Sequence, residues 1–190
     1  MRFSKIEIRD LVISVIVLSL VFSRFNIPSL PLITLVVVLA FVLHELGHKF
    51  VAQKYGCTAE FRMWPMGLFL GVVTAALGGI VFAAPGAVMI SPYSKDKFAF
   101  RIAHLREKEI GHISIAGPAI NLAIGFASFA LMIFSPSSVL STIAQISFFL
   151  ALFNLIPFGP LDGRKILDWN KYIWLLSIVL AAIGYVALFV

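Results

Sequence analysis

Residues 31–50 read PLITLVVVLAFVLHELGHKF, an apolar run that acquires ionisable side chains only near its C-terminal end. About 20 residues of α-helix extend about 30 Å, which is the thickness of the hydrocarbon core of a bilayer. The run therefore predicts a membrane-spanning helix. Two histidines, His44 and His48, and the carboxylate of Glu45 lie inside it. Because ionisable groups are costly to bury in a span, we expect these three to serve a function.

The composition of the whole chain agrees with this expectation. Of its 190 residues, 61% are hydrophobic and 13% are charged, whereas soluble domains have roughly 45–50% apolar and roughly 25% charged residues. This excludes a water-soluble globule and a disordered chain. The net charge is +6, but the basic residues cluster at the ends of uncharged runs, which is typical of membrane proteins and speaks against a nucleic-acid partner. The single cysteine, Cys57, excludes an internal disulfide.

Long uncharged runs predict an all-α membrane protein, a polytopic bundle of about five transmembrane helices. The runs are residues 11–23, completed by flanking residues from 8 to 27, then 31–50, 113–134, 139–158 and 172–190. No internal repeat is visible, so we interpret residues 1–190 as a single integral-membrane domain. The predicted location is the cell membrane, which the chain crosses several times.

Residues 63–94 are also uncharged, but glycines and prolines interrupt them. They are long enough for one crossing and too short for two helices with a turn. The basic residues fall on one face of the membrane only if this segment crosses an even number of times, so the positive-inside rule favours a membrane-embedded strand or re-entrant segment at about 63–94. The N-terminus is then inside, the C-terminus outside and the active site near the cytoplasmic side. These basic residues are Arg2, Lys5, Arg9, Lys49, Lys54, Lys95, Lys97, Arg101, Arg106, Lys108, Arg164, Lys165 and Lys171.

The sequence HELGH at 44–48 indicates metal chemistry. Residues four apart lie on one face of a helix, so His44 and His48 can reach a single ion. Glu45 lies about 100° round the helix from His44, close enough to touch a bound water. Two nitrogen donors, a third ligand, an open position and a carboxylate base are what a zinc hydrolase needs. The alternative is that His44 and Glu45 pair with each other or with a polar group on a neighbouring helix.

Asp162 is the candidate third ligand. No Asp, Glu, Lys or Arg occurs between Glu109 and Asp162. Pro157 and Pro160 are expected to break the fourth helix near its inner end, and the freed backbone can turn Asp162 towards the bundle. With a re-entrant 63–94, the second and fourth spans run in the same direction and reach the same depth. With a single crossing, Asp162 would lie on the opposite face from the histidines.

The combination of HELGH with NLIPFGPLDG at 154–163 resembles the site-2 protease family of intramembrane zinc metalloproteases, over residues from about 44 to 163. The resemblance implies that His44, His48 and Asp162 bind one Zn²⁺ per chain and that Glu45 is the catalytic base. It also implies that Asn154 lies beside the site, where it positions the scissile carbonyl or its oxyanion.

The implied function is hydrolysis of peptide bonds within transmembrane segments of substrate proteins in the lipid bilayer, known as regulated intramembrane proteolysis. The family's strands after the metal-binding helix fit 63–94, and residues 82–90 are a candidate edge for pairing with a substrate strand, with plain packing as the alternative. Residues 116–121 lie in the third predicted span and match the family's helix that packs against the other two, where small residues allow close helix approach. We expect Asn121 there to form an interhelical hydrogen bond rather than to catalyse. Two departures are the lack of a PDZ-like insert and the single span after Asp162.

Another class of protein remains open, a membrane metal-ion transporter or binding protein that uses the same His and Asp ligands and needs no general base. An inactive homologue ranks lower because every expected ligand is present. Other residues are interpreted as structural: Cys57 as a structural thiol rather than a fourth ligand, His104 and His112 as surface or interfacial residues, and Trp64, Trp169 and Trp174 as interface anchors. The sequence identifies neither the substrate nor the oligomeric state.

Overall fold

The computed structural model describes residues 3–78, 81–82, 84–91 and 105–189, and in them the chain forms helices and one small sheet. The helical elements are α1 (Lys5–Phe22), η1 (Ile27–Ser29), α2 (Leu30–Val37), η2 (Val38–Val42), α3 (Leu43–Lys54), α4 (Pro65–Ala76), α5 (Glu107–Phe134), α6 (Ser138–Leu155), α7 (Asp162–Trp169) and α8 (Lys171–Val186). The strands are β1 (Thr58–Met63) and β2 (Gly86–Ser91). Four residues used above, Lys95, Lys97, Arg101 and His104, lie outside the described residues, as does Arg2.

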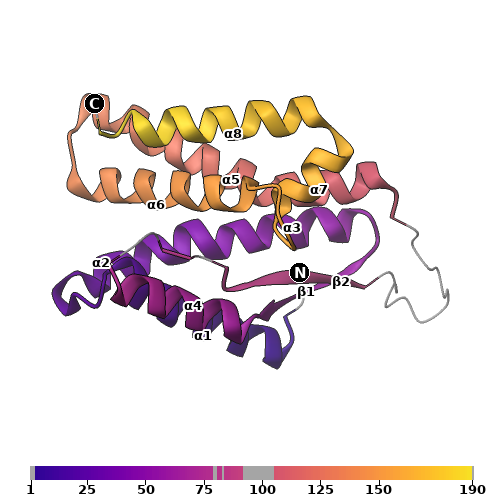
Figure 1. The fold of residues 1–190 in the computed structure, drawn as a ribbon, viewed down its shortest axis with the longest axis horizontal. Helices are drawn as coiled ribbons and strands as arrows, with labels where there is room; N and C mark the ends of the chain where they lie inside the picture. Colours follow the sequence, from indigo (N-terminus) through magenta and orange to yellow (C-terminus); the bar gives the residue numbers. More distant parts are fainter. Residues whose placement is uncertain (1–2, 79–80, 83, 92–104, 190) are drawn as a thin grey trace.

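The long helices lie side by side along the longest axis of the molecule, with α5, α6 and α8 on one side of α3 and with α1 and α4 on the other (Figure 1). Within the described part of the chain, three helical stretches are long and apolar enough to cross a membrane: Ile27–Lys54, α5 and α6. Two further helices, α4 and α8, are apolar but shorter. These helices support a membrane protein, whereas the count of about five spans stays a prediction.

Residues 63–94 contain both strand and helix. β1 pairs with β2 in an antiparallel sheet in which Phe61 lies opposite Val88. The chain between the strands includes α4, which begins at Pro65, a position where proline is favoured because the first helical amides lack partners in any case. The expected strand is therefore present but begins earlier, at Thr58, and the segment also carries a helix that the sequence did not predict.

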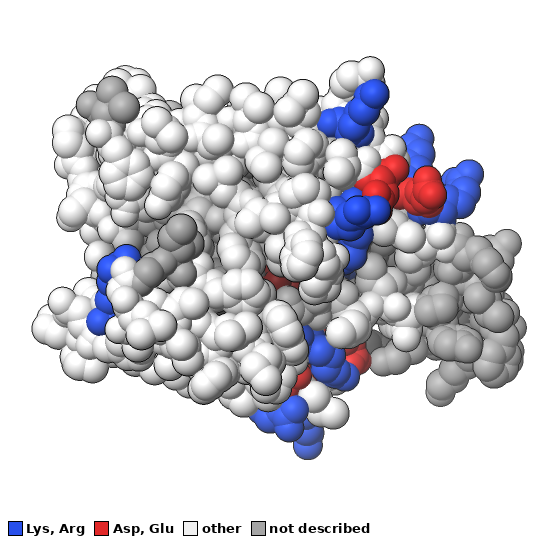
Figure 2. Space-filling model, in the orientation of Figure 1, with Lys and Arg blue, Asp and Glu red and all other residues white. Residues whose placement is uncertain are grey.

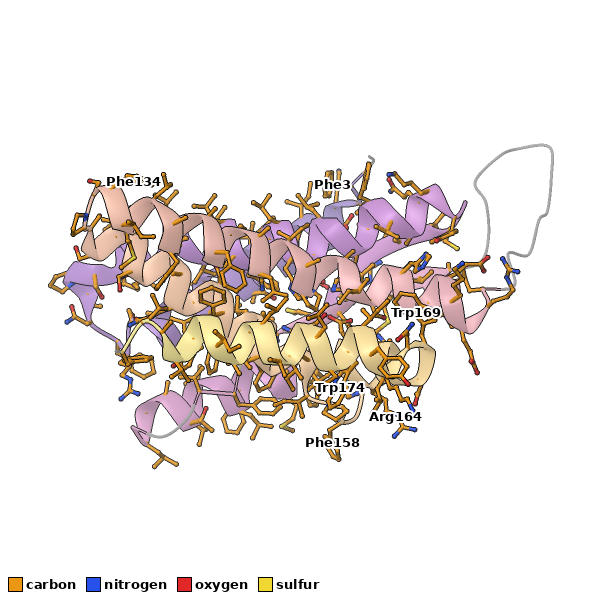
Figure 3. The ribbon with its side chains drawn as sticks, turned by 90° about the horizontal axis from the view of Figure 1, so that it is seen from above. Phe3, Phe134, Phe158, Arg164, Trp169 and Trp174 are labelled. Atoms are coloured by element: carbon orange, nitrogen blue, oxygen red, sulfur yellow. The ribbon has the colours of Figure 1, made fainter. Side chains whose placement is uncertain are left out.

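Most of the charged residues gather at one end of the molecule, and a small basic group lies at the opposite end (Figure 2). The larger group lies over the end that carries α7 and along the N-terminal part of α1, while the face over α4, α6 and α8 is almost free of charge. In Figure 3, Arg164 and Trp169 lie at this polar end and Phe134 lies at the opposite end. Such an uncharged band between ends of different polarity is the surface that a bilayer requires.

A π-helical turn, η2, lies directly before the predicted metal-binding residues. It joins α2 to α3 without interrupting the helix, so Ile27–Lys54 is continuous. Single π turns within α-helices are frequent at functional sites because they change which side chains share a face. Ala40 and Phe41 of this turn are buried in the apolar core between α1, α2 and α6. The turn therefore joins a core-facing apolar stretch to the polar residues that follow.

Candidate metal centre

The structure brings together the three residues expected as ligands. His44 and His48 lie on α3, Asp162 is the first residue of α7, and one ligand atom from each lies within 4.8 Å of the others. The two Nε2 atoms are 3.0 Å apart, and Asp162 Oδ2 is 3.4 Å from His44 Nε2 and 3.1 Å from His48 Nε2. All three residues are buried, with 3%, 6% and 8% of their surface exposed.

These separations fit a zinc ion. Ligand atoms at about 2.0–2.1 Å from the metal in a tetrahedral site are about 3.3 Å apart, close to the distances between the three donor atoms. The set of two imidazoles and one carboxylate is also one that zinc favours. Nδ1 of His48 donates a hydrogen bond to the carbonyl oxygen of Ile113 (2.7 Å), which leaves the Nε2 lone pair free for a metal.

Asn121 provides the corresponding contact for His44. Its amide nitrogen lies 3.1 Å from His44 Nδ1, and its Oδ1 is buried with no hydrogen-bond partner among the described residues. Rotating the Asn121 side-chain amide by half a turn exchanges its nitrogen and oxygen and places Oδ1 beside His44 Nδ1. The His44 ring then keeps its proton on Nδ1, and Nε2 is free to bind a metal. The interhelical hydrogen bond expected for Asn121 is therefore present, but its partner is a candidate ligand, which the sequence did not indicate.

Gly117 of α5 packs directly against both imidazoles. A Cβ atom at this position would lie 2.4 Å from His48 Nε2 and 2.6 Å from His44 Nε2. On the facing helix, a Cβ at Gly47 would lie 2.5 Å from Ile120 Cδ1. The small residues between α3 and α5 thus allow the close helix approach expected from the sequence, and they also make room for the site.

The position of Asp162 depends on the break after α6. This helix ends at Leu155, and the chain turns through Gly159, whose φ of 58° favours glycine, before α7 begins at Asp162. The Nε1–H of Trp174 donates to the carbonyl oxygen of Leu155 (2.8 Å), one of the orphan acceptors at this helix end. Trp174 therefore also holds this turn, beyond its expected role as an interface anchor.

Glu45 and Asn154 line the cavity beside these donors. The cavity has a volume of about 510 Å³, and residues of β2, including Val88 and Ile90, form part of its wall. Glu45 is 7% exposed, and its Oε2 has no hydrogen-bond partner in the described structure. Asn154 donates from Nδ2 to the carbonyl oxygen of Leu150 in its own helix (2.9 Å). Oε2 of Glu45 is thus free to accept a proton, while the Asn154 amide is held at the cavity wall.

The sequence interpretation assigned no role in the site to two cationic residues of the cavity wall. Arg62 of β1 and Lys165 of α7 both line the cavity, and Arg62 Nη2 donates to Glu60 (2.6 Å). The carbonyl oxygen of Ile113 was also missed, because a backbone group gives no signal in a sequence. Only the fold shows that these groups from distant segments surround one cavity.

Cys57 and His112 lie outside the candidate centre. Cys57 is buried with Ala52, Ala59 and Ile113, and burial raises the pKa of its thiol, with a smaller contribution from Glu109. This environment fits the structural thiol expected for it. His112 Nδ1 forms a hydrogen bond with the Tyr55 hydroxyl, and its ring packs edge-on against Trp169. It therefore lies at a contact between helices.

Apolar helices that enclose a buried group of two histidines and one aspartate define a membrane protein with a candidate metal centre. The chain is similar to "Putative zinc metalloprotease MJ0611" of Methanocaldococcus jannaschii, with 43% identity over 97% of this chain and 94% of that protein. It is also similar to "Putative zinc metalloprotease YwhC" of Bacillus subtilis, with 25% identity over 77% of this chain and 72% of that protein. These similarities and the residues of the site show that the chain belongs to the site-2 protease family of zinc metalloproteases.

A third relative is much longer than the matched region. "Putative zinc metalloprotease Rip3" of Mycobacterium tuberculosis is 35% identical over 69% of this chain, but the match covers 28% of that protein. No protein-family model matches the chain, and no solved structure matches it. The assignment to the family therefore rests on curated relatives and on the site, and the function it supports is that of a zinc metalloprotease.

Proposed function

We propose that the chain is an intramembrane endopeptidase that hydrolyses peptide bonds within transmembrane segments of substrate proteins. The observation that carries the proposal is the buried group of His44, His48 and Asp162, with the unpartnered Oε2 of Glu45 beside it. His44, Glu45 and His48 lie on a helix that is apolar and long enough to span a bilayer. The proposal includes about five spans, residence in the cell membrane and one Zn²⁺ per chain.

The depth of the site supports cleavage inside the membrane. His48 lies six residues before Lys54, the last residue of α3, which corresponds to about 9 Å along the helix. A centre at this depth below the polar end, on an apolar helix, supports a site within the bilayer. Lys54, Arg106, Arg164 and Lys171 lie at or near the ends of elements on the polar side, so the positive-inside rule assigns this side to the cytoplasm.

The residues of the chain have distinct roles in the proposed hydrolysis. Zinc, when bound, would act as a Lewis acid that lowers the pKa of a water molecule to about 7. The Glu45 carboxylate accepts a proton from the attacking water and delivers it to the leaving amine as the C–N bond breaks. Ile113 and Asn121 orient the imidazoles of His48 and His44. The Asn154 amide lies at the cavity wall, from which it positions the scissile carbonyl.

A substrate must unwind to expose its backbone, and β2 offers an edge with which the unwound segment can pair. The Trp64 N–H donates to the Pro85 carbonyl oxygen across the sheet (2.7 Å), whereas the N–H groups of Phe61 and Met63 donate to α1 on the other side. By the alternation of an antiparallel ladder, the N–H and C=O groups of Val88, opposite Phe61, point away from β1. This edge belongs to the strand that lines the cavity.

The direct test compares the wild type with Glu45→Gln in two measurements: the zinc content of the purified protein and the cleavage of a transmembrane peptide. We expect zinc in both, because Glu45 is not a ligand, and loss of cleavage by at least roughly a hundredfold in the variant, as for removal of a general base. The substrate is a synthetic transmembrane peptide of leucine and alanine with a central Gly-Pro break, in liposomes. Zinc bound with no Glu45-dependent cleavage would contradict the proposal and favour the metal transporter.

A further inference from the structure

Two carboxylates of α1 bind the outer edge of β1. The Phe61 N–H donates to Glu7 Oε1 (3.2 Å), and the Met63 N–H donates to Asp10 Oδ2 (3.3 Å). Glu7 and Asp10 are 1% and 3% exposed. The two amides that a further strand would need at this end of β1 are therefore already bonded. Negative charge along the same edge also repels the carbonyl oxygens of an approaching backbone.

The same Glu7 carboxylate holds the helix that carries the candidate ligands. Lys49 Nζ donates to both oxygens of Glu7, each at 2.6 Å, and Lys49 is itself 1% exposed. Lys49 directly follows His48 in α3. In Figure 1 the sheet lies between α3 and α1. One buried carboxylate thus joins the first helix, the sheet and the metal-binding helix.

The two edges of the sheet are consequently unlike. The β1 edge is covered by α1 and bonded to carboxylates, whereas β2 lines the cavity that contains His44, Glu45 and Asp162. A buried ion pair adds little to stability compared with apolar groups of the same size, but it can select one arrangement of the elements around it. The Glu7–Lys49 pair is placed to select the position of the sheet relative to α3.

We propose that Glu7 is a positioning residue, which closes the β1 edge and fixes the sheet against α3. A substrate strand is then accepted only along β2 and in one register relative to Glu45 and the candidate ligands. This inference rests on the proposed function, because it concerns how that site selects the peptide bond to be cut. Glu7 itself touches neither substrate nor metal.

Two variants test this role. Glu7→Asp keeps a negative charge near Lys49 but is one methylene shorter, so it cannot reach both Lys49 and Phe61. The double variant Glu7→Leu with Lys49→Met replaces both charges by apolar groups of similar size, which spares the fold a lone buried charge. The matched control is Asp168→Asn, which removes the carboxylate of an exposed pair with Arg164.

The peptide with the central Gly-Pro break is the substrate, and product masses, KM and kcat are measured together with zinc content. For Glu7→Asp and for the double variant we expect wild-type zinc content, KM raised several-fold, a smaller change in kcat, and cleavage at additional neighbouring bonds. Asp168→Asn should retain the wild-type bond and KM. Wild-type KM and a single wild-type cleavage site in Glu7→Asp would overturn the proposal, whether or not the double variant folds.

Backbone amide hydrogen exchange is a readout that needs no catalysis. Without substrate, the amides of Phe61 and Met63 should be protected, while those of Val88 and Ile90 should exchange until the peptide is added. Glu7→Asp should accelerate exchange at Phe61. Fast exchange at Phe61 in the wild type would overturn the closed edge. Absence of any cleavage by the wild type, with the expected exchange pattern, would instead count against the proposed function.

Discussion

Ile113 and Asn121 hold the two imidazoles on the side away from the candidate metal position. One does so through a backbone carbonyl and the other through a side chain, so only Asn121 can be tested by substitution. An acceptor on Nδ1 selects the tautomer with a free Nε2 lone pair and fixes the ring plane. His44 therefore depends for its orientation on a residue 77 positions away in the sequence.

Replacing Asn121 with leucine should weaken zinc binding by roughly 10–100-fold, the usual loss when the partner of a ligating histidine is removed. Competition with a chromophoric chelator measures the affinity. Asn121→Asp keeps an acceptor for Nδ1–H and should bind zinc nearly as tightly as the wild type. Wild-type affinity in a folded Asn121→Leu variant would show that the contact does not position His44.

The sequence predicts the positions of some site residues but not the contacts of others. The spacing of His44 and His48 on a helix was enough to place both on one face, and the prolines before Asp162 were enough to predict a break. Whether Oε2 of Glu45 has a hydrogen-bond partner, and which group Asn121 contacts, depend on which groups from other helices lie nearby. No local pattern contains that information.

Alternate backbone amides of strand β2 point towards opposite edges of the strand, so removing one or the other has different effects. Inward-pointing amides of β2 hold the sheet together, whereas outward-pointing amides lie on the edge away from β1, in a strand that lines the cavity. Proline removes an amide donor wherever it is placed, so its effect depends on the side on which that donor lies. Adjacent residues of this strand therefore provide a matched pair of substitutions.

Val88→Pro should leave the sheet intact but reduce cleavage of the transmembrane peptide by at least roughly tenfold, about 1.4 kcal/mol, because an outward donor is lost. Met89→Pro, opposite Glu60, removes an inward donor and should lower the thermal unfolding temperature. Both are measured on purified protein, with zinc content as a check on folding. Unchanged cleavage by a folded Val88→Pro variant would show that β2 does not pair with the substrate.

The helix α4 shows where prediction of elements fails. Residues 63–94 are apolar and uncharged throughout, so neither hydrophobic periodicity nor charge distinguishes a buried helix from a strand. The segment was expected to return to its starting side because of the basic residues around it, and the two strands do pair with each other. The helix between them, which packs against α1, was not predicted.

For the molecule as a whole, the arrangement of charge and apolar surface determines how it sits in a bilayer. The turn between α5 and α6 lies at the end opposite α7 (Figure 1). If the chain crosses the membrane about five times, these two places lie on opposite sides. Both Ser135 in the turn and Asp168 in α7 are exposed, so each can carry a reporter thiol.

Labelling with a membrane-impermeant thiol reagent tests this arrangement. In a Cys57→Ala background, Ser135→Cys should react from outside intact cells, and Asp168→Cys should react only after the membrane is permeabilised. The parent variant without cysteine is the control for nonspecific labelling. Reaction of both cysteines from the same side would contradict the proposed topology.

The sequence by itself was sufficient for the membrane class, for HELGH on an apolar helix and for the break that precedes Asp162. Hydropathy, residue spacing and proline act over a few neighbouring residues, so they can be interpreted without the fold. The meeting of Asp162 with the histidines, the contact of Asn121 and the closure of the β1 edge by Glu7 required the packed structure. Each joins groups from distant segments, and their geometry depends on how the helices pack against one another.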